Sequence, residues 1–326
     1  MKGPDPVTRL ISLPAIRMSR LARWLPDAVD GRIRVLAWVS LVIQVLIVLT
    51  GGAVRLTASG LGCSTWPQCT PGSLVVTPEQ GIHGFIEFGN RMVAVFLALA
   101  TVATFVLVLR LRRRRPDLFW LAFCVGLYIP IQAVMGGITV LTNLNPYVVG
   151  LHFVLSVALV AASSAFVERV YHRESDTVAH ARAVPRWFAL TARATAVLLA
   201  VTIVVGVLTT GSGPHAGDAD AARNGLDSEL LQHLHSLPAY VTFGLTLVLA
   251  TAALTLGLAP VRIAILWLAG CEFLQIAVGL LQANTGLPIV LVGIHLVVAC
   301  MTAGAMTWVV LRTGAAGRSR RRGTTP

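Results

Sequence analysis

The sequence is dominated by long apolar blocks, each about the 20 residues that an α-helix needs to cross the hydrocarbon core of a bilayer. The blocks are continuous rather than alternating, which favours helices over a β-barrel. The 326-residue chain is 12% charged, about half the fraction of a typical soluble domain. We therefore expect an all-α polytopic membrane protein. Its eight transmembrane helices are predicted at 35–54, 86–110, 118–140, 147–168, 188–208, 233–256, 262–281 and 289–312.

The distribution of the arginines predicts the orientation in the membrane. They gather in the N-terminal arm (1–34), in "RLRRRR" at 110–115, in the stretch 169–187 and in the tail (313–326), which all fall on one side of eight spans. Three arginines fall on the other side: Arg55, Arg91 and Arg223. Positive charge marks the cytoplasmic side, so both termini are expected there. We interpret the net charge of +12 as topology signals beside anionic lipid and expect no nucleic-acid partner.

The first apolar block is not expected to be a cleaved signal peptide. It follows a long basic arm, has no small-residue cleavage site and continues into a charged loop.

An internal repeat relates the two halves of the chain. Gln132 precedes His152 by 20 residues, and Gln275 precedes His295 by the same distance. Each glutamine is followed four residues later by glycine, and each histidine is preceded by "VG" and one further residue. The match predicts a duplication into two parallel four-helix bundles, 35–168 and 188–312, joined by a cytoplasmic linker at 169–187.

Four histidines lie near the outer ends of the predicted helices: His83, His152, His235 and His295. Each half thus offers histidines on two helices at one depth, and facing histidines in a helix bundle can hold a haem from both axial sides. The alternative is that each histidine forms a hydrogen bond between helices. In the second half His235 and His295 form the predicted bis-histidine pair, which suits electron transfer.

The first half differs because Asn90 occupies the position that matches His235. His83 lies two turns before Asn90 on nearly the same helix face, and Glu87 lies between them. Arg91 follows Glu87 by four residues and can pair with it. One interpretation is structural: these residues cap the start of the helix, and Glu87 and Arg91 form an ion pair. The other is a cofactor site with His152 as the firm ligand and Glu87 as an acid or base.

Cys63 and Cys69 lie in the first outer loop, "GCSTWPQCTPG". That side of the membrane is oxidising, so we expect a disulfide between them. A zinc site is the competing interpretation, but two thiols without further ligands make a poor one.

Several segments together resemble haem A synthase over nearly the whole chain: "GGAVRLTASGLGCSTWPQC", "FIEFGNR", "QAVMGGITVL", "GLHFVLS" and "GIHLVV". "TGSGPHAGD" resembles the outer loop of the bacterial, particularly actinobacterial, branch. The resemblance implies a plasma-membrane oxidoreductase that converts haem O to haem A. A ring methyl group becomes a formyl group, with water as the oxygen source. Its product would serve a terminal oxidase.

The resemblance also implies roles for individual residues. His152 would ligate the substrate haem, His235 and His295 would ligate a haem b, Glu87 would be catalytic, and Cys63 and Cys69 would be the family's outer-loop cysteine pair. Many members have "EYSHR" where this chain has "EFGNR", so Asn90 replaces a histidine ligand. Either His83 supplies the ligand from two turns away, which its mobile position near the loop favours, or the substrate iron keeps an open position.

A second departure lies in the outer loop between the fifth and sixth helices, which has no cysteine pair. His215 stands there instead, and a solvated or loop-ordering role is the expectation. Arg55 and Arg91 are candidates to bind haem propionates, because a guanidinium matches a carboxylate at two points. The alternative for both is snorkelling at the membrane edge.

The expected partners are the lipid bilayer, haem O synthase as supplier of substrate, an unidentified electron-transfer partner and the terminal oxidase that receives haem A. Two rival functions remain open. One is a haem carrier or chaperone without enzymatic activity, and the other is a cytochrome b-type quinone oxidoreductase.

Overall fold

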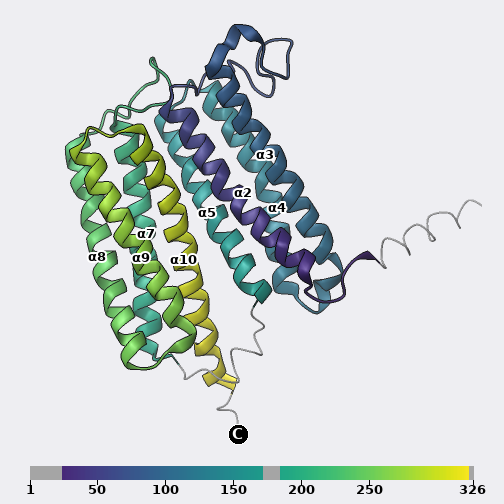
Figure 1. Ribbon diagram of the computed structural model, residues 1–326, viewed down its shortest axis with the longest axis vertical. Helices are drawn as coiled ribbons and strands as arrows, with labels where there is room; N and C mark the ends of the chain where they lie inside the picture. Colours follow the sequence, from purple (N-terminus) through teal and green to yellow (C-terminus); the bar gives the residue numbers. More distant parts are fainter. Residues whose placement is uncertain (1–23, 172–183, 323–326) are drawn as a thin grey trace, which may run out of the picture.

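The computed structural model describes residues 24–171 and 184–322 and is helical throughout, with eight helices long and apolar enough to cross a membrane in that part of the chain (Figure 1). The prediction of an eight-span, all-α membrane protein is confirmed. Residues 1–23 of the arm, 172–183 of the linker and 323–326 of the tail lie outside the described residues. The long helices are α2 (Gly31–Leu56), α3 (Gly81–Val108), α4 (Pro116–Leu141), α5 (Pro146–Tyr171), α7 (Arg186–Ser212), α8 (Ser228–Thr255), α9 (Ala259–Asn284) and α10 (Ile289–Arg322).

The helices extend beyond the predicted apolar blocks. Helix α3 begins at Gly81 rather than at 86, after a short 3-10 turn at Pro78–Gln80. Helix α8 begins at Ser228 rather than at 233, because the Asp227 side chain caps it by accepting from the Leu230 N–H. Hydropathy marks the hydrocarbon layer, whereas a helix ends where its backbone groups find other partners.

The eight helices pack as two groups of four, which lie side by side (Figure 1). In the first bundle, α2 contacts α3, α3 contacts α4, α4 contacts α5, and α5 returns to α2. Helices α7 to α10 form the same closed ring in the second bundle. Helix α5 meets α10 between the bundles, flanked by α5 against α7 and α10 against α2. If a twofold axis related the two halves, it would superimpose the contact of α5 with α7 on the contact of α10 with α2.

Matching turns also support a duplication, which stays a proposal. The α4–α5 turn places Asn143 and Leu144 at φ values of 49° and 58°. The α9–α10 turn places Gly286 and Leu287 at 76° and 58°. In both turns the leucine N–H donates to a carbonyl in the last turn of the preceding helix.

The connections 57–80 and 213–227 lie at one end of the molecule, opposite the end where α10 finishes (Figure 1). We call this the disulfide end, after the loop of Cys63 and Cys69. Helices α3, α5, α8 and α10 all begin there, so the four histidines predicted near the outer ends lie within the first three turns of these helices.

Candidate functional site

His235 on α8 and His295 on α10 face each other inside the second bundle. Their ring centroids are 6.4 Å apart and their planes are inclined by 66°. An imidazole nitrogen lies about 2 Å from a metal ion that it ligates, so two rings on opposite sides of one iron have centroids roughly 6 Å apart. The separation in the structure therefore fits a haem held by both rings.

The ring of His235 is oriented by hydrogen bonding. Its Nδ1 donates to the Thr202 carbonyl of α7 over 2.9 Å. A carbonyl only accepts, so the proton is on Nδ1 and Nε2 keeps the lone pair that a metal needs. The Nδ1 of His295 is buried and has no hydrogen-bond partner within the described residues. Buried polar atoms are rarely left in this state, and it is consistent with a ring whose partner is a bound group.

Glycines make room for both rings. A Cβ at Gly206 on α7 would lie 2.7 Å from Cε1 of His235. A Cβ at Gly279 on α9 would lie 3.3 Å from Cε1 of His295. Each imidazole thus lies against helix backbone that carries no side chain. Because glycine has no Cβ, α7 and α9 can come close to the two rings.

His152 on α5 has a similar setting in the first bundle. Its Nδ1 is also buried without a partner in the described chain, and a Cβ at Gly136 on α4 would lie 3.6 Å from its Cε1. The Gln132 amide donates to the His152 carbonyl and, over 2.7 Å, to the Ser156 hydroxyl, which links α4 to α5. The glycine and histidine matched in sequence between the halves are thus in contact in both.

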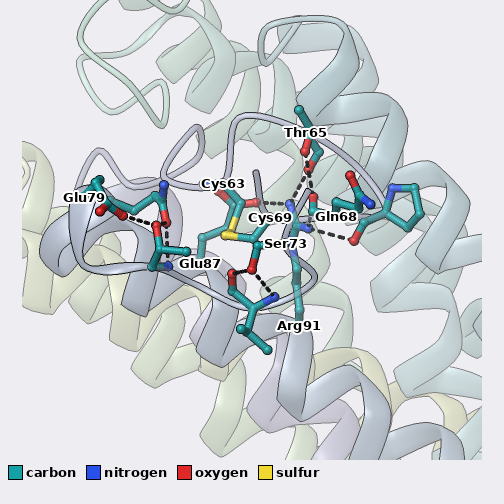
Figure 2. Close-up of a disulfide and its surroundings, with 12 residues drawn as sticks. Cys63, Thr65, Gln68, Cys69, Ser73, Glu79, Glu87 and Arg91 are labelled. Carbon is teal, nitrogen blue, oxygen red and sulfur yellow. Dashed lines mark hydrogen bonds and ion pairs between the residues drawn. A yellow bond between two sulfur atoms is a disulfide. The ribbon is translucent and has the colours of Figure 1, made fainter. Parts of the chain in front are cut away.

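Glu87 on α3 is buried, with a relative exposure of 5%, and both of its oxygens have partners (Figure 2). Oε2 accepts from the Cys63 N–H over 2.7 Å, and Oε1 pairs with Arg91 over 2.6 Å. The expected pairing of Glu87 with Arg91 is confirmed. Arg91 also donates to the carbonyls of Thr65 and Gln68, so the pair fastens the outer loop to α3.

Cys63 and Cys69 form the expected disulfide, and both residues are fully buried. The loop that they close lies against the start of α3, beside Glu87 and Arg91 (Figure 2). Trp66, within this loop, packs its ring directly onto Gly137 of α4. No group of three or more His, Cys, Asp or Glu side chains able to hold a metal ion occurs in the part of the chain that the structure describes.

His83 and Asn90 both have partners from α2 or the loop after it. His83 is exposed, and its Nδ1 lies 2.9 Å from the Ser59 hydroxyl. Asn90 Oδ1 accepts from the Thr50 hydroxyl over 2.7 Å. The assignment of His83 or Asn90 as the second ligand of the first bundle stays a prediction.

The arginines and the histidine predicted on the outer side all bind loop backbone at the disulfide end. Arg55 donates to the carbonyls of His215 and Thr210, tying α2 to the second bundle. Arg223 donates to the carbonyls of Ala221 and Pro214. His215 Nε2 donates to the Leu287 carbonyl, which fits the loop-ordering role expected for it. Binding of haem propionates by Arg55 or Arg91 stays a prediction.

A buried acid in the middle of a membrane-spanning helix was missed by the sequence interpretation. Glu272 lies in the middle of α9 with 5% relative exposure, and its Oε1 accepts from the Thr246 hydroxyl of α8. The signal was present, because an acidic residue at the centre of an apolar block is costly and needs a reason.

Comparison with known proteins places the chain in a family. A family model described as "Cytochrome oxidase assembly protein" (COX15-CtaA) matches residues 34–307, which is most of the sequence. The chain belongs to this cytochrome oxidase assembly family. The family's link to oxidase assembly agrees with the resemblance drawn from the short motifs, and that recognition is confirmed.

Individual relatives of the cytochrome oxidase assembly family match over part of their length. A protein of Geobacillus kaustophilus named "Heme A synthase" is 28% identical over 38% of this chain and 38% of its own. A Listeria welshimeri protein of the same name is 31% identical over 40% and 43%, respectively. A third, from Geobacillus thermodenitrificans, is 28% identical over 43% and 45%. The matched stretches thus span less than half the length of these curated relatives.

Proposed function

We propose that this protein is a haem A synthase, which oxidises the ring methyl group of haem O to a formyl group. The observation that carries the proposal is that half-buried histidine sites occur at matching positions in both bundles, together with one buried carboxylate, Glu87, in the first bundle. Family membership and the names of the relatives support it. The conversion consumes one water, which supplies the formyl oxygen, and releases four electrons and four protons. A multi-pass protein in the bacterial plasma membrane, with both termini cytoplasmic, is proposed as the setting.

The second bundle is proposed to hold a haem b through His235 and His295. When bound, this haem accepts and passes single electrons. Thr202 keeps the His235 ring in the tautomer that leaves Nε2 available. Because His235 and His295 would both be used to hold this haem, the site would suit electron transfer, and the substrate chemistry is assigned to the first bundle.

The first bundle is proposed to hold haem O, with His152 as its ligand. Glu87 is the base that takes protons as the methyl group is oxidised. Because Arg91 and the Cys63 N–H hold both of its oxygens, the carboxylate has a fixed position at the mouth of the bundle. His83 or Asn90 faces the iron from the other side, and Arg55 and Arg91 are the proposed propionate donors.

The partners follow from this chemistry. Haem O comes from haem O synthase within the bilayer, an electron-transfer partner removes the electrons, and a terminal oxidase receives haem A. The lipid-facing walls of the bundle accept the prenyl tail of the substrate.

The direct test is co-expression with haem O synthase in a host that makes no haem A, followed by extraction and chromatography of the pigments. We expect haem A to appear. Unchanged haem O bound in stoichiometric amount would instead support a haem carrier. Quinol-dependent haem reduction without modification of haem would support a quinone oxidoreductase.

Glu87→Gln separates a chemical role of this residue from a structural one. Glutamine keeps an oxygen that can accept from the Cys63 N–H or from Arg91, but it cannot take up a proton. We expect haem A formation to fall by two or more orders of magnitude, as for loss of a general base, while haem b stays bound. Glu79→Gln is the control, because Glu79 is an exposed acid at the same end of the molecule. Near-normal activity of Glu87→Gln would reduce Glu87 to an anchor of the loop.

A further inference from the structure

Glu272 is a buried acid that the proposed reaction does not use. It lies near the middle of the membrane-spanning helix α9, far from either end. Its Oε1 accepts from the Thr246 hydroxyl over 3.1 Å, and its Oε2 is buried with no partner in the described residues. A carboxylate in this position, without a cation beside it, would be costly in hydrocarbon.

No positive side chain balances Glu272 within the part of the chain that the structure describes. Arg262, on the same helix, lies about 15 Å away along the axis at 1.5 Å per residue. The titratable side chains beside it in sequence or on the packed helices include Cys271 on α9, His235 and Tyr240 on α8, and His295 and Cys300 on α10. None of these is a lysine or an arginine, so the charge of Glu272 is left to be balanced by a proton or by a bound group.

The position of Glu272 relates it to the haem proposed between His235 and His295. Gly279 touches the His295 ring, and Glu272 lies seven residues before it on α9, which is two turns along nearly the same face. The carboxyl is thus roughly 10 Å along the helix axis from the level of the ring. Charges at such a separation interact appreciably in a low-dielectric interior.

The same face of α9 carries further buried polar atoms. Gln275 and Gln282 lie between Glu272 and the disulfide end, and the Oε1 atom of each is buried without a partner in the described chain. Unpaired buried oxygens of this kind are where internal waters bind. Together with Gly279 they make a continuous stripe at helical spacing from the end of α9 to Glu272.

We propose that Glu272 exchanges a proton in step with the oxidation state of the haem in the second bundle. When the ferric iron gains one electron, the Glu272 carboxylate takes up one proton through the Gln282–Gln275 stripe. When the electron leaves for the external acceptor, the proton returns to water. Each cycle therefore moves one electron and one proton, and the net charge inside the bundle is unchanged. The inference rests on the proposed haem in this bundle.

The test is a redox titration of the full-length protein, reconstituted in lipid and produced in a host that makes no haem O, so that only the second-bundle haem is present. We expect the midpoint potential of wild type to fall as the pH rises, by at most the ~59 mV per pH unit of one proton per electron. In Glu272→Gln the potential should not depend on pH over the same range. Glu229→Gln, which changes an exposed acid at the start of α8, should keep the wild-type slope. A flat wild-type titration, or an unchanged slope in Glu272→Gln, would overturn the inference.

Infrared difference spectra of reduced minus oxidised wild-type protein give a second measurement that needs no variant at position 272. We expect the C=O band of a protonated carboxylic acid to grow on reduction. The band should shift in Thr246→Val, which removes the hydrogen bond to Oε1, and should exchange more slowly into heavy water in Gln275→Leu. Absence of any carboxylic band would overturn the inference while leaving haem A formation intact. A protein that binds no haem at all would instead overturn the proposed function itself.

Discussion

At the scale of single residues, the second-bundle site is defined by what surrounds the two imidazoles. One carbonyl, that of Thr202, fixes the tautomer of His235, and two glycines give the rings space against neighbouring helices. Residues that orient a ligand in this way affect metal binding nearly as strongly as the ligands do. The contacts of Gly206 are the tightest, because its missing Cβ lies close to two atoms of the His235 ring.

Gly206→Ala is therefore expected to push His235 away from Thr202 and to weaken haem binding by roughly 10- to 100-fold, although no ligand is changed. The measurement is haem content by absorbance after purification, followed by titration with added haem. Gly244→Ala on α8 is the matched control, since a Cβ there meets nothing within 4 Å, and it should bind haem normally. Equal haem content in the two variants would show that the His235 ring is not positioned by Gly206.

Sequence and structure agree best where spacing alone carries the information. The equal sequence spacings from Gln132 to His152 and from Gln275 to His295 were enough to predict that the two histidines occupy equivalent positions on matching helices of the two halves. The helix containing Glu87 and Arg91 predicted their ion pair, since i and i+4 residues share a face. Sequence spacing did not reveal the attachment of Arg91 to the carbonyls of Thr65 and Gln68. Those contacts depend on how the loop folds back, for which no periodic pattern exists.

At the scale of elements, the disulfide loop contacts α3 on one side and α4 on the other. Arg91 of α3 donates to loop carbonyls, and the Cys63 N–H donates to Glu87 (Figure 2). On the other side, Trp66 lies on the bare backbone of Gly137 in α4. The loop thereby fixes the only buried acid near the start of α3 among the described residues. The placement of the loop therefore determines the position of Glu87, on which the proposed chemistry of this carboxylate depends.

Gly137→Ala is expected to displace the Trp66 ring and loosen the loop, because a Cβ at this position would overlap the indole. Haem A formation should drop several-fold while haem b content is kept. Protease sensitivity of the loop should rise in parallel. Gly126→Ala on the same helix, where a Cβ meets nothing within 4 Å, serves as the control. Wild-type activity in Gly137→Ala would indicate that docking of Trp66 does not matter for the reaction.

At the scale of the whole molecule, two bundles are joined along α5 and α10. Near the end opposite the disulfide loop, Arg312 of α10 binds both oxygens of Glu168 on α5, over 2.7 and 3.0 Å. The Trp308 indole N–H donates to the Ser164 carbonyl one turn away. At the disulfide end, Arg55 reaches from α2 to the α7 region. The halves are thus fastened at both ends, which holds the two proposed haem sites at a fixed distance.

Arg312→Met removes the guanidinium that binds both oxygens of the buried Glu168, and losing one member of such a pair costs about 3–5 kcal/mol. We expect a clear fall in the thermal unfolding temperature, measured in detergent or lipid by a dye-free fluorescence melt. The double variant Arg312→Met/Glu168→Met should recover most of the loss, because it removes the buried carboxylate as well. A single variant as stable as wild type would show that this link adds nothing to the joining of the bundles.

Two histidine sites, one in each bundle, are the central claim, and the haem content of the purified protein tests it most directly. Wild type produced with haem O synthase should contain haem b and a second, substrate-derived haem. His235→Ala/His295→Ala should lose the haem b and keep the other, and His152→Ala should show the reverse. Purified wild type without tetrapyrrole, or a His235→Ala/His295→Ala variant with its full haem complement, would contradict the claim.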